Sequence, residues 1–239
     1  MTNLAIAIVN YHTEEFLRPC LESVLMSVQS ISSEIYVVNN GSSKNEIDAL
    51  KAELPGVNWI DPGENIGYSA ANNLVMREAR TRYVLLLNPD VIVPAGSLDR
   101  LMERCDANPE IGIAGCALVY PDGIIQQGPR EGEIFSEDMA LEQGGIIIDW
   151  PFVLGACMLI RRQAVEQCGV LDERIFMFHE DVEYCRRVRE KGFRVCLFPD
   201  IYITHYGGAS YSDLDWSIVE RQKAVSFIIY CRNCLPPTR

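Results

Sequence analysis

Residues 83–90 have the sequence Tyr-Val-Leu-Leu-Leu-Asn-Pro-Asp, and their pattern recurs through the first part of the chain. Five consecutive apolar residues are too hydrophobic for a strand with a solvated face, so we expect residues 83–87 to be buried on both sides of a sheet. Similar short runs occupy residues 4–9 and 35–38, and segments with helical spacing of apolar residues separate the runs. This alternation predicts an α/β fold with a mostly parallel central sheet flanked by helices.

The same patterns predict further elements. Helices are expected at residues 16–28, 46–53, 68–79, from 180 onward and at 215–231, and strands at 57–60, a pair in 111–120, 152–160, 193–198 and 201–204. Residues 131–149 contain six acidic residues and no basic one, which favours a solvated loop or flap that touches an acceptor. We expect one domain over residues 1–214, divided near residue 90 into a nucleotide-binding half and an acceptor half, followed by a C-terminal helix and tail.

Composition argues against several functions. The 239-residue chain has a net charge of −12, which disfavours nucleic acid as a partner because phosphate binding needs a clustered basic surface. Residues 4–9 are too short for a secretory signal, and residues 150–160 are well short of the ~20 residues that span a bilayer. Most of the nine cysteines lie in apolar runs, and Cys231 and Cys234 form one C-x-x-C without the second pair typical of zinc sites. These features favour a reducing cytoplasm.

Two polar segments could bind a ligand: one follows a predicted strand, and the other precedes a predicted helix. Asn88-Pro89-Asp90 ends the apolar strand, and either it is a simple β-turn or its carboxylate is an oxygen ligand for Mg²⁺ or Mn²⁺. Residues 65–73, Asn-Ile-Gly-Tyr-Ser-Ala-Ala-Asn-Asn, place Gly67 before a helix whose N-terminus favours anions. The alternative for Gly67 is an ordinary loop glycine before a helix.

Glu180 and Asp181 begin a predicted helix after an aromatic run. Helical spacing places Asp181 on the apolar face with Tyr184, while Glu183 points elsewhere. A carboxylate on an apolar face must be paired, functional or an N-cap, and all three remain open here. Burial raises the pKa of such a carboxyl group and the helix dipole lowers it, so sequence leaves its protonation state open.

His205 ends a predicted strand, where a histidine is either structural or a metal ligand. Tyr11, Asn39 and Asn40 also lie at predicted strand ends, where a nucleobase and ribose could bind.

Taken together, these segments resemble family 2 glycosyltransferases of the GT-A fold, and especially their bacterial rhamnosyltransferase-like subgroup. The resemblance covers residues 6–210 and rests on these segments in family order: IVNYHTEEFLRPCLESV, VVNNGSS, ENIGYSAANN, YVLLLNPDV, GACMLIRRQAVEQCGVLDERIFMFHEDVEYCRRVREKGFRV and THYGGAS.

The resemblance implies roles for particular residues. Asp90 is the remaining acid of a DxD-type metal site, and His205 is a second contact to the metal or diphosphate. Asp181 is the general base, with Glu180 as an adjacent helper. The residues implied for donor binding are Val9, Tyr11, Asn39, Gly67, Asn72 and Asn88. The family usually has Asp where this chain has Asn39, and an amide offers a nucleobase a different hydrogen-bonding pattern.

The function that follows is inverting transfer of a hexose or deoxyhexose, rhamnose among them, from a UDP- or dTDP-sugar. The acceptor is a hydroxyl group of a glycan or lipid-linked glycan in surface-glycan synthesis, with peripheral contact at the inner face of the plasma membrane. Two alternatives are a sugar-1-phosphate nucleotidyltransferase and a catalytically silent glycan-binding domain. The first usually has a glycine-rich basic loop after its first strand, whereas residues 10–15 here contain neither Gly nor Lys.

Overall fold

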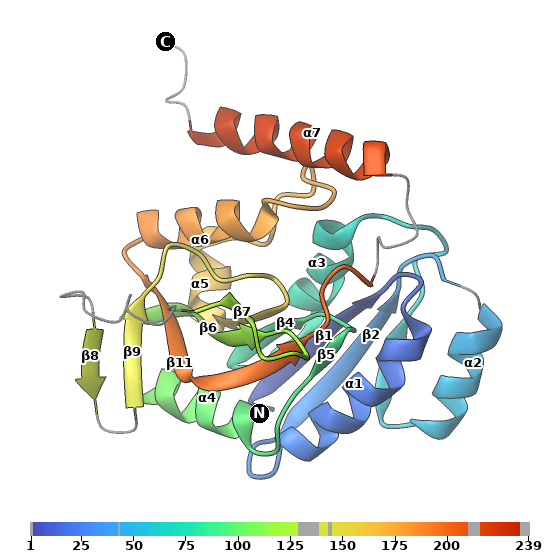
Figure 1. Ribbon diagram of the computed structural model, residues 1–239, viewed down its shortest axis with the longest axis horizontal. Helices are drawn as coiled ribbons and strands as arrows, with labels where there is room; N and C mark the ends of the chain where they lie inside the picture. Colours follow the sequence, from blue (N-terminus) through green and yellow to red (C-terminus); the bar gives the residue numbers. More distant parts are fainter. Residues whose placement is uncertain (1, 43, 129–138, 143–144, 210–215, 235–239) are drawn as a thin grey trace.

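The apolar runs of the first part of the chain form adjacent strands of one sheet, which carries helices on both faces (Figure 1). The computed structural model describes residues 2–42, 44–128, 139–142, 145–209 and 216–234. The strands are β1 (Leu4–Asn10), β2 (Ser33–Asn39), β3 (Val57–Ile60), β4 (Tyr83–Leu87), β5 (Val91–Ile92), β6 (Ile111–Val119), β7 (Ile125–Gln127), β8 (Met139–Glu142), β9 (Gly145–Asp149), β10 (Cys157–Arg161) and β11 (Arg194–His205). The helices are α1 (Glu14–Ser27), α2 (Lys44–Glu53), α3 (Tyr68–Glu78), α4 (Ser97–Ala107), α5 (Arg162–Cys168), α6 (Glu180–Glu190) and α7 (Trp216–Cys234). The α/β prediction is confirmed.

The first half of the sheet is parallel, as its continuous apolar strands predict. The sheet order is β3-β2-β1-β4-β10-β6-β11-β9-β8. β1 lies between β2 and β4, with Ile6 opposite both Ile35 and Leu85. Strands buried on both faces need apolar side chains at every position, which explains why these runs do not alternate with polar residues.

The second half departs from the sequence prediction in strand number and direction. β10 is antiparallel to both β4 and β6, which makes the sheet mixed. Residues 111–119 form one strand, β6, and not a pair. β10 begins at Cys157 and not at residue 152, and the two strands expected after residue 193 are one strand, β11, with a register shift between Phe198 and Tyr202. Pairing along one long neighbour, β6, joins the two halves of β11.

The acidic segment is also more ordered than predicted. Residues 139–142 and 145–149 are strands β8 and β9, so the expectation of a loop is wrong for them. β9 pairs with β11 in antiparallel fashion, and Ile147 is buried in the core. The segment is acidic on average, but it contains the apolar run Ile146–Ile148, which can be buried in a strand. Residues 131–138 and 143–144 lie outside the described part of the chain.

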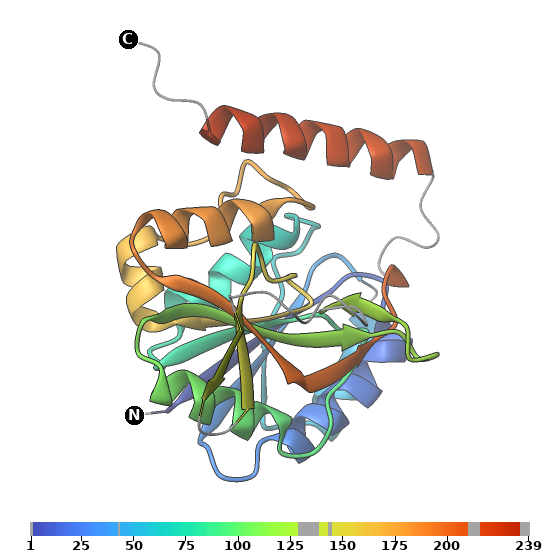
Figure 2. The ribbon, with the colours of Figure 1, turned by 60° about the vertical axis from the view of Figure 1, so that its left-hand side comes forward.

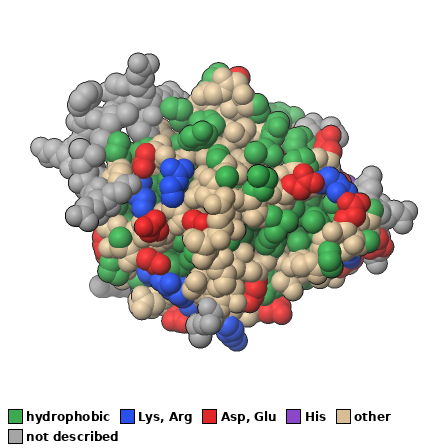
Figure 3. Space-filling view, turned by 90° about the horizontal axis from the view of Figure 1, so that it is seen from below, with side chains coloured by type: hydrophobic (Ala, Val, Ile, Leu, Met, Phe, Trp, Pro, Cys, Tyr) green, Lys and Arg blue, Asp and Glu red, His purple; other side chains and the backbone are tan. Residues whose placement is uncertain are grey.

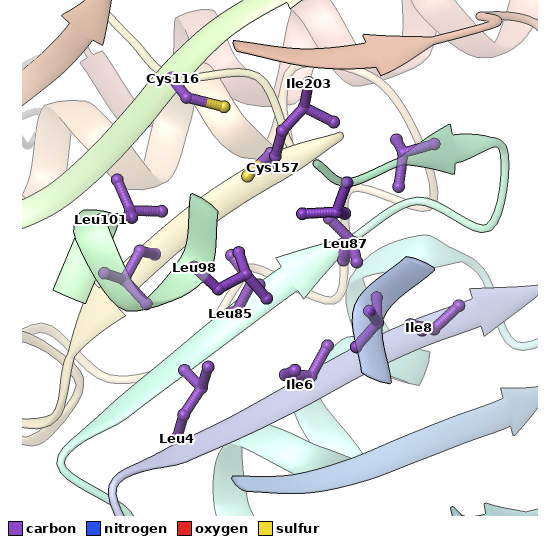
Figure 4. Packing of buried hydrophobic residues seen from close by; sticks show 14 of the residues in the cluster. Leu4, Ile6, Ile8, Leu85, Leu87, Leu98, Leu101, Cys116, Cys157 and Ile203 are labelled. Carbon is purple, nitrogen blue, oxygen red and sulfur yellow. The ribbon is translucent and has the colours of Figure 1, made fainter. Parts of the chain in front are cut away.

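A separate apolar core lies on each face of the sheet, because successive strand side chains point to opposite sides. On one face, Leu4, Ile6 and Ile8 of β1 pack with α1, α2 and α4. Figure 4 shows these side chains together with Leu85, Leu87, Leu98 and Leu101. The smaller side chains of β1 on the other face, Ala5 and Ala7, pack under α3, α5 and α6.

Helix α7 lies outside these layers, over α6 (Figure 2). The terminal helix was predicted at this place in the chain. Among the described residues, no helix combines the length and the apolar character that a bilayer span requires. On the face in Figure 3, Lys and Arg side chains lie among acidic and apolar ones.

Candidate active site

A cavity of about 630 Å³ opens where several strands end. Its wall includes Val9 and Tyr11 at the end of β1, Asn40 after β2, Asn88 after β4 and His205 at the end of β11. Because β1, β2 and β4 are parallel neighbours, their carboxyl ends share one edge of the sheet (Figure 1). Ligands of open α/β sheets bind beyond this edge.

Asp90 and His205 lie against each other beside this cavity. Asp90 is only 3% exposed and follows β4 in the turn that Asn88-Pro89-Asp90 was expected to form. His205 pairs with Val91 of β5, which brings its Nε2 to 3.3 Å from Asp90 Oδ1. That oxygen has no hydrogen-bond partner among the described residues. A buried carboxylate oxygen without a donor, next to an imidazole nitrogen, fits a divalent cation.

The protein supplies only part of a coordination shell at this point. In the described part of the chain, no group of three or more His, Cys, Asp and Glu side chains is arranged to hold a metal ion. Mg²⁺ at a diphosphate usually takes one or two protein carboxylates and completes its shell with phosphate oxygens and water. Asp90 and His205 fit such a shared site and not an all-protein cage.

Glu180 and Asp181 occupy another part of the same cavity wall. They are the first two residues of α6, whose N-cap is His179 and not Asp181, so the capping interpretation is wrong. Asp181 Oδ1 accepts the N–H of Val182 at 2.8 Å, and Oδ2 accepts the N–H of Gly155 at 3.3 Å. The Asp181 carboxylate is therefore held by backbone donors on both oxygens, facing the cavity.

Burial decides the protonation of this acidic pair. Burial, followed by the charge of Asp181, raises the pKa of Glu180 from 4.5 to about 8. Burial also raises the pKa of Asp181, but the N–H groups of Val182 and Gly155 oppose that shift by stabilising the charged form. Glu180 Oε2, in contrast, has no hydrogen-bond partner among the described residues. Burial without a donor thus favours the protonated form of Glu180, and the two backbone donors favour the carboxylate form of Asp181.

Helix α7 supports the segment that precedes the acidic pair. Phe178 and His179 both have positive φ, 70° and 67°, a conformation that is unfavourable for residues other than glycine. The ring of His179 lies 5.5 Å from that of Phe227, and Ser226 Oγ donates to the carbonyl oxygen of Met177 at 2.7 Å. These contacts offset the strain and fix where α6 begins.

Three residues expected to bind the donor are not in the cavity wall. Asn39 bonds within the protein, because its Oδ1 accepts the N–H of Ser42 at 3.2 Å and its Nδ2 donates to the carbonyl oxygen of Ser42 at 3.4 Å. Gly67 packs against protein, since a Cβ there would lie 2.6 Å from Phe176 Cδ2. Asn72 is fully buried and donates to the carbonyl oxygen of Tyr68 at 3.0 Å. Asn40, next to Asn39, reaches the cavity.

Glu183 also differs from its prediction. It was expected to point away from the apolar face, yet its side chain is almost completely buried. Arg187 Nε donates to both of its carboxylate oxygens, at 2.9 and 2.8 Å. A full ion pair compensates the burial of this charge, so Glu183 is structural.

Tyr68 and Gln126 are among the residues of the cavity wall that the sequence did not reveal. The Tyr68 hydroxyl donates to the carbonyl oxygen of Gly155 at 2.8 Å, which fixes the backbone that donates to Asp181. Gln126 contacts His205 through both ends of its amide. Neither side chain has a pattern that distinguishes it in the sequence, because each acts through a residue remote in the chain.

The chain is similar to several known proteins. It is 28% identical over 217 residues to the O-antigen biosynthesis protein RfbC of Myxococcus xanthus. The aligned region covers 82% of this chain and only 16% of that protein. It is 25% identical over 235 residues to the N-acetylglucosaminyl-diphospho-decaprenol L-rhamnosyltransferase of Mycobacterium tuberculosis, covering 85% of this chain and 76% of that enzyme.

The fold has a solved counterpart. The mannosyltransferase PcManGT of Pyrobaculum calidifontis, in complex with GDP-Man and Mn²⁺, superimposes with a TM-score of 0.69 over 100% of this chain and 65% of its own, at 14% identity. This similarity identifies the GT-A fold. A family profile described as glycosyltransferase like family 2 matches residues 2–225. Since that match extends over nearly the whole length, from β1 into α7, the chain belongs to the family 2 glycosyltransferases.

Proposed function

We propose that this glycosyltransferase is an inverting, metal-dependent enzyme that transfers a hexose or a deoxyhexose such as rhamnose from UDP or dTDP to a hydroxyl acceptor. The observation that carries the proposal is the presence, around one cavity, of two unlike acidic centres. One is Asp90 beside His205, which fits a cation, and the other is Asp181 beside the neutral Glu180.

The roles follow from the two environments. The acceptor oxygen forms a bond to the anomeric carbon while the bond from that carbon to the diphosphate oxygen breaks. Asp181 takes the hydroxyl proton, because its carboxylate is the charged member of the acidic pair. A single displacement inverts the anomeric centre. Asp90 and His205 would hold Mg²⁺ or Mn²⁺, which when bound neutralises charge developing on the diphosphate.

The two parts of the chain contribute different residues to the cavity. Val9, Tyr11, Asn40 and Asn88, all from residues 1–90, line the cavity and are suited to the nucleotide. Glu180 and Asp181 come from residues 91–214, which we assign to the acceptor. A deoxyhexose donor is supported by the rhamnosyltransferase among the relatives.

A lipid-linked acceptor at the cytoplasmic face of the membrane is supported by two observations. The M. tuberculosis relative is named for a decaprenol-linked acceptor. Trp216, Ile218 and Phe227 of α7 are exposed, and Ile218 also lines the cavity. All nine cysteines are free, in keeping with a reducing compartment.

Neither alternative function is favoured. The family match assigns glycosyl transfer and not nucleotidyl transfer. A silent glycan-binding domain has no need for a buried carboxylate with an unpartnered oxygen or for a neutral Glu180, both of which cost stability.

The test is a thermal-shift series with UDP, dTDP, GDP and their sugars, with and without Mn²⁺. A ligand at 100 times its Kd adds about 2.7 kcal/mol of stability. We expect stabilisation by UDP or dTDP that depends on Mn²⁺, followed by transfer to a hydroxyl acceptor with inverted anomeric configuration. Absence of stabilisation by every nucleotide would refute the proposal, and retention of configuration would refute its mechanism.

A further inference from the structure

Gln126 is the extra residue of a β-bulge. Gln127 of β7 pairs with Leu118 of β6, and Ile125 pairs with Val119, so Gln126 between them has no partner of its own. A bulge bends a strand and changes the direction of a side chain, and bulges are over-represented next to active sites. Here the bulge directs Gln126 toward the end of β11, where the side chain joins the cavity wall.

Both ends of the Gln126 amide contact one residue, His205, 79 positions away. Gln126 Nε2 donates to the main-chain carbonyl oxygen of His205 at 3.0 Å, and Gln126 Oε1 lies 2.7 Å from His205 Nδ1. A carbonyl oxygen only accepts, so the first bond assigns the NH₂ end of the amide and leaves Oε1 facing the ring. Because Oε1 is also only an acceptor, the hydrogen of the neutral imidazole is on Nδ1.

The other ring nitrogen is thereby left with a lone pair. It is this atom, Nε2, that lies 3.3 Å from Asp90 Oδ1 and 3.3 Å from Asn88 Nδ2. With hydrogen on Nδ1, Nε2 accepts a hydrogen bond from Asn88 Nδ2, and the neutral ring offers no proton to the unpartnered Asp90 oxygen. Two electron-pair donors, Nε2 and Asp90 Oδ1, therefore face each other. That arrangement is favourable when a cation lies between them.

We propose that Gln126 is a positioning residue of the cation site: it sets the tautomer and the ring orientation of His205, so that Nε2 and Asp90 act together on a divalent cation. The inference rests on the proposed function. Partners of this kind, which bond the second nitrogen of a metal-binding histidine, typically account for 10–100-fold in metal affinity.

The experiment measures Mn²⁺ binding without turnover. The probe is Mn²⁺ with UDP and, separately, with dTDP, followed by electron paramagnetic resonance for affinity and by the ¹⁴N coupling of a bound imidazole. Gln126→Met keeps the length of the side chain and removes the acceptor. We expect it to weaken Mn²⁺ binding about 10–100-fold and to reduce the ¹⁴N coupling, with the unfolding temperature measured alongside.

Two further variants separate the causes. Gln126→Glu keeps an acceptor for Nδ1–H and should retain the ¹⁴N coupling, and it is the deciding variant should Gln126→Met fail to fold. Gln163→Leu, at an exposed position of α5 outside the cavity wall, is the control and should bind as wild type. Wild-type affinity and coupling in Gln126→Met, or loss of coupling in folded Gln126→Glu, would overturn the inference alone. A wild-type protein that binds no Mn²⁺ with either nucleotide would overturn the cation site, and this inference with it.

Discussion

Replacing Glu180 by glutamine should remove much of the pH dependence of this protein's stability. Glu180 is 7% exposed, its Oε2 has no hydrogen-bond partner among the described residues, and it is adjacent to Asp181. Burial and the charge of Asp181 raise its pKa from 4.5 to about 8. The folded protein therefore keeps a proton that the unfolded chain releases at much lower pH.

The shift in the pKa of Glu180 determines how the free energy of unfolding changes with pH, in both sign and size. Between pH 4.5 and about 8 the folded state binds more protons than the unfolded state, so the free energy of unfolding falls as the pH rises. The loss begins near the unfolded pKa and is complete above the folded one. A shift of this size corresponds to at most about 5 kcal/mol, and we expect a smaller effect because Asp181 titrates together with Glu180. Glutamine mimics the neutral form at every pH.

The assay is urea unfolding, followed by tryptophan fluorescence at several pH values from about 5 to about 9. Wild type and Glu180→Gln should have similar stability at the acidic end, and the variant should become progressively the more stable one up to about pH 8. Glu166→Gln, at an exposed position on α5, is the control and should keep the wild-type slope. A difference between Glu180→Gln and wild type that does not change with pH would refute the assignment of the proton to Glu180.

Three further predictions concern the site and its support. Asp181→Asn should lower turnover about 10²–10⁴-fold with little change in donor affinity, measured by steady-state kinetics, and unchanged turnover would exclude Asp181 as the base. Asp90→Ala should abolish the Mn²⁺-dependent part of nucleotide stabilisation in thermal-shift titrations, and an identical Mn²⁺ titration would exclude it from the cation site. Gly67→Ala should cost about 1–3 kcal/mol or more by urea unfolding, because φ is +85° and the new Cβ would collide with Phe176. Gly56→Ala, which meets nothing within 4 Å and has no positive φ, should cost far less; equal effects would contradict the steric argument.

The parallel part of the fold could be predicted from local pattern. Runs such as Leu4–Val9 and Tyr83–Leu87 contain no polar position, so their only stable environment is a sheet covered on both faces. The carboxyl ends of those strands then bring Tyr11 and Asn88 to one edge, where the cavity lies. The acids at positions 90 and 181 were identifiable because each follows or begins a strongly patterned element.

The antiparallel part could not be predicted in the same way. Nothing local distinguishes the apolar residues of β10 from those of β4, yet β10 runs in the opposite direction between β4 and β6. Strand direction and register depend on which neighbours are available in space. The length of β11 and the strand conformation of Ile146–Ile148 likewise depend on pairing with strands that are remote in the sequence.

Sequence by itself determined the chemical inventory of the site: the carboxylates, the histidine and the strand ends that carry them. Tertiary structure decided what each of them does. Burial raises the pKa of Glu180, whereas backbone donors from Gly155 and Val182 oppose the same shift at Asp181. Glu183, only three residues from Glu180, forms an ion pair with Arg187. Gln126 acquires a role only because a bulge brings it to His205. Protonation and tautomer depend on solvent exclusion and on donors from distant segments, which are properties of the packed chain and not of any local pattern.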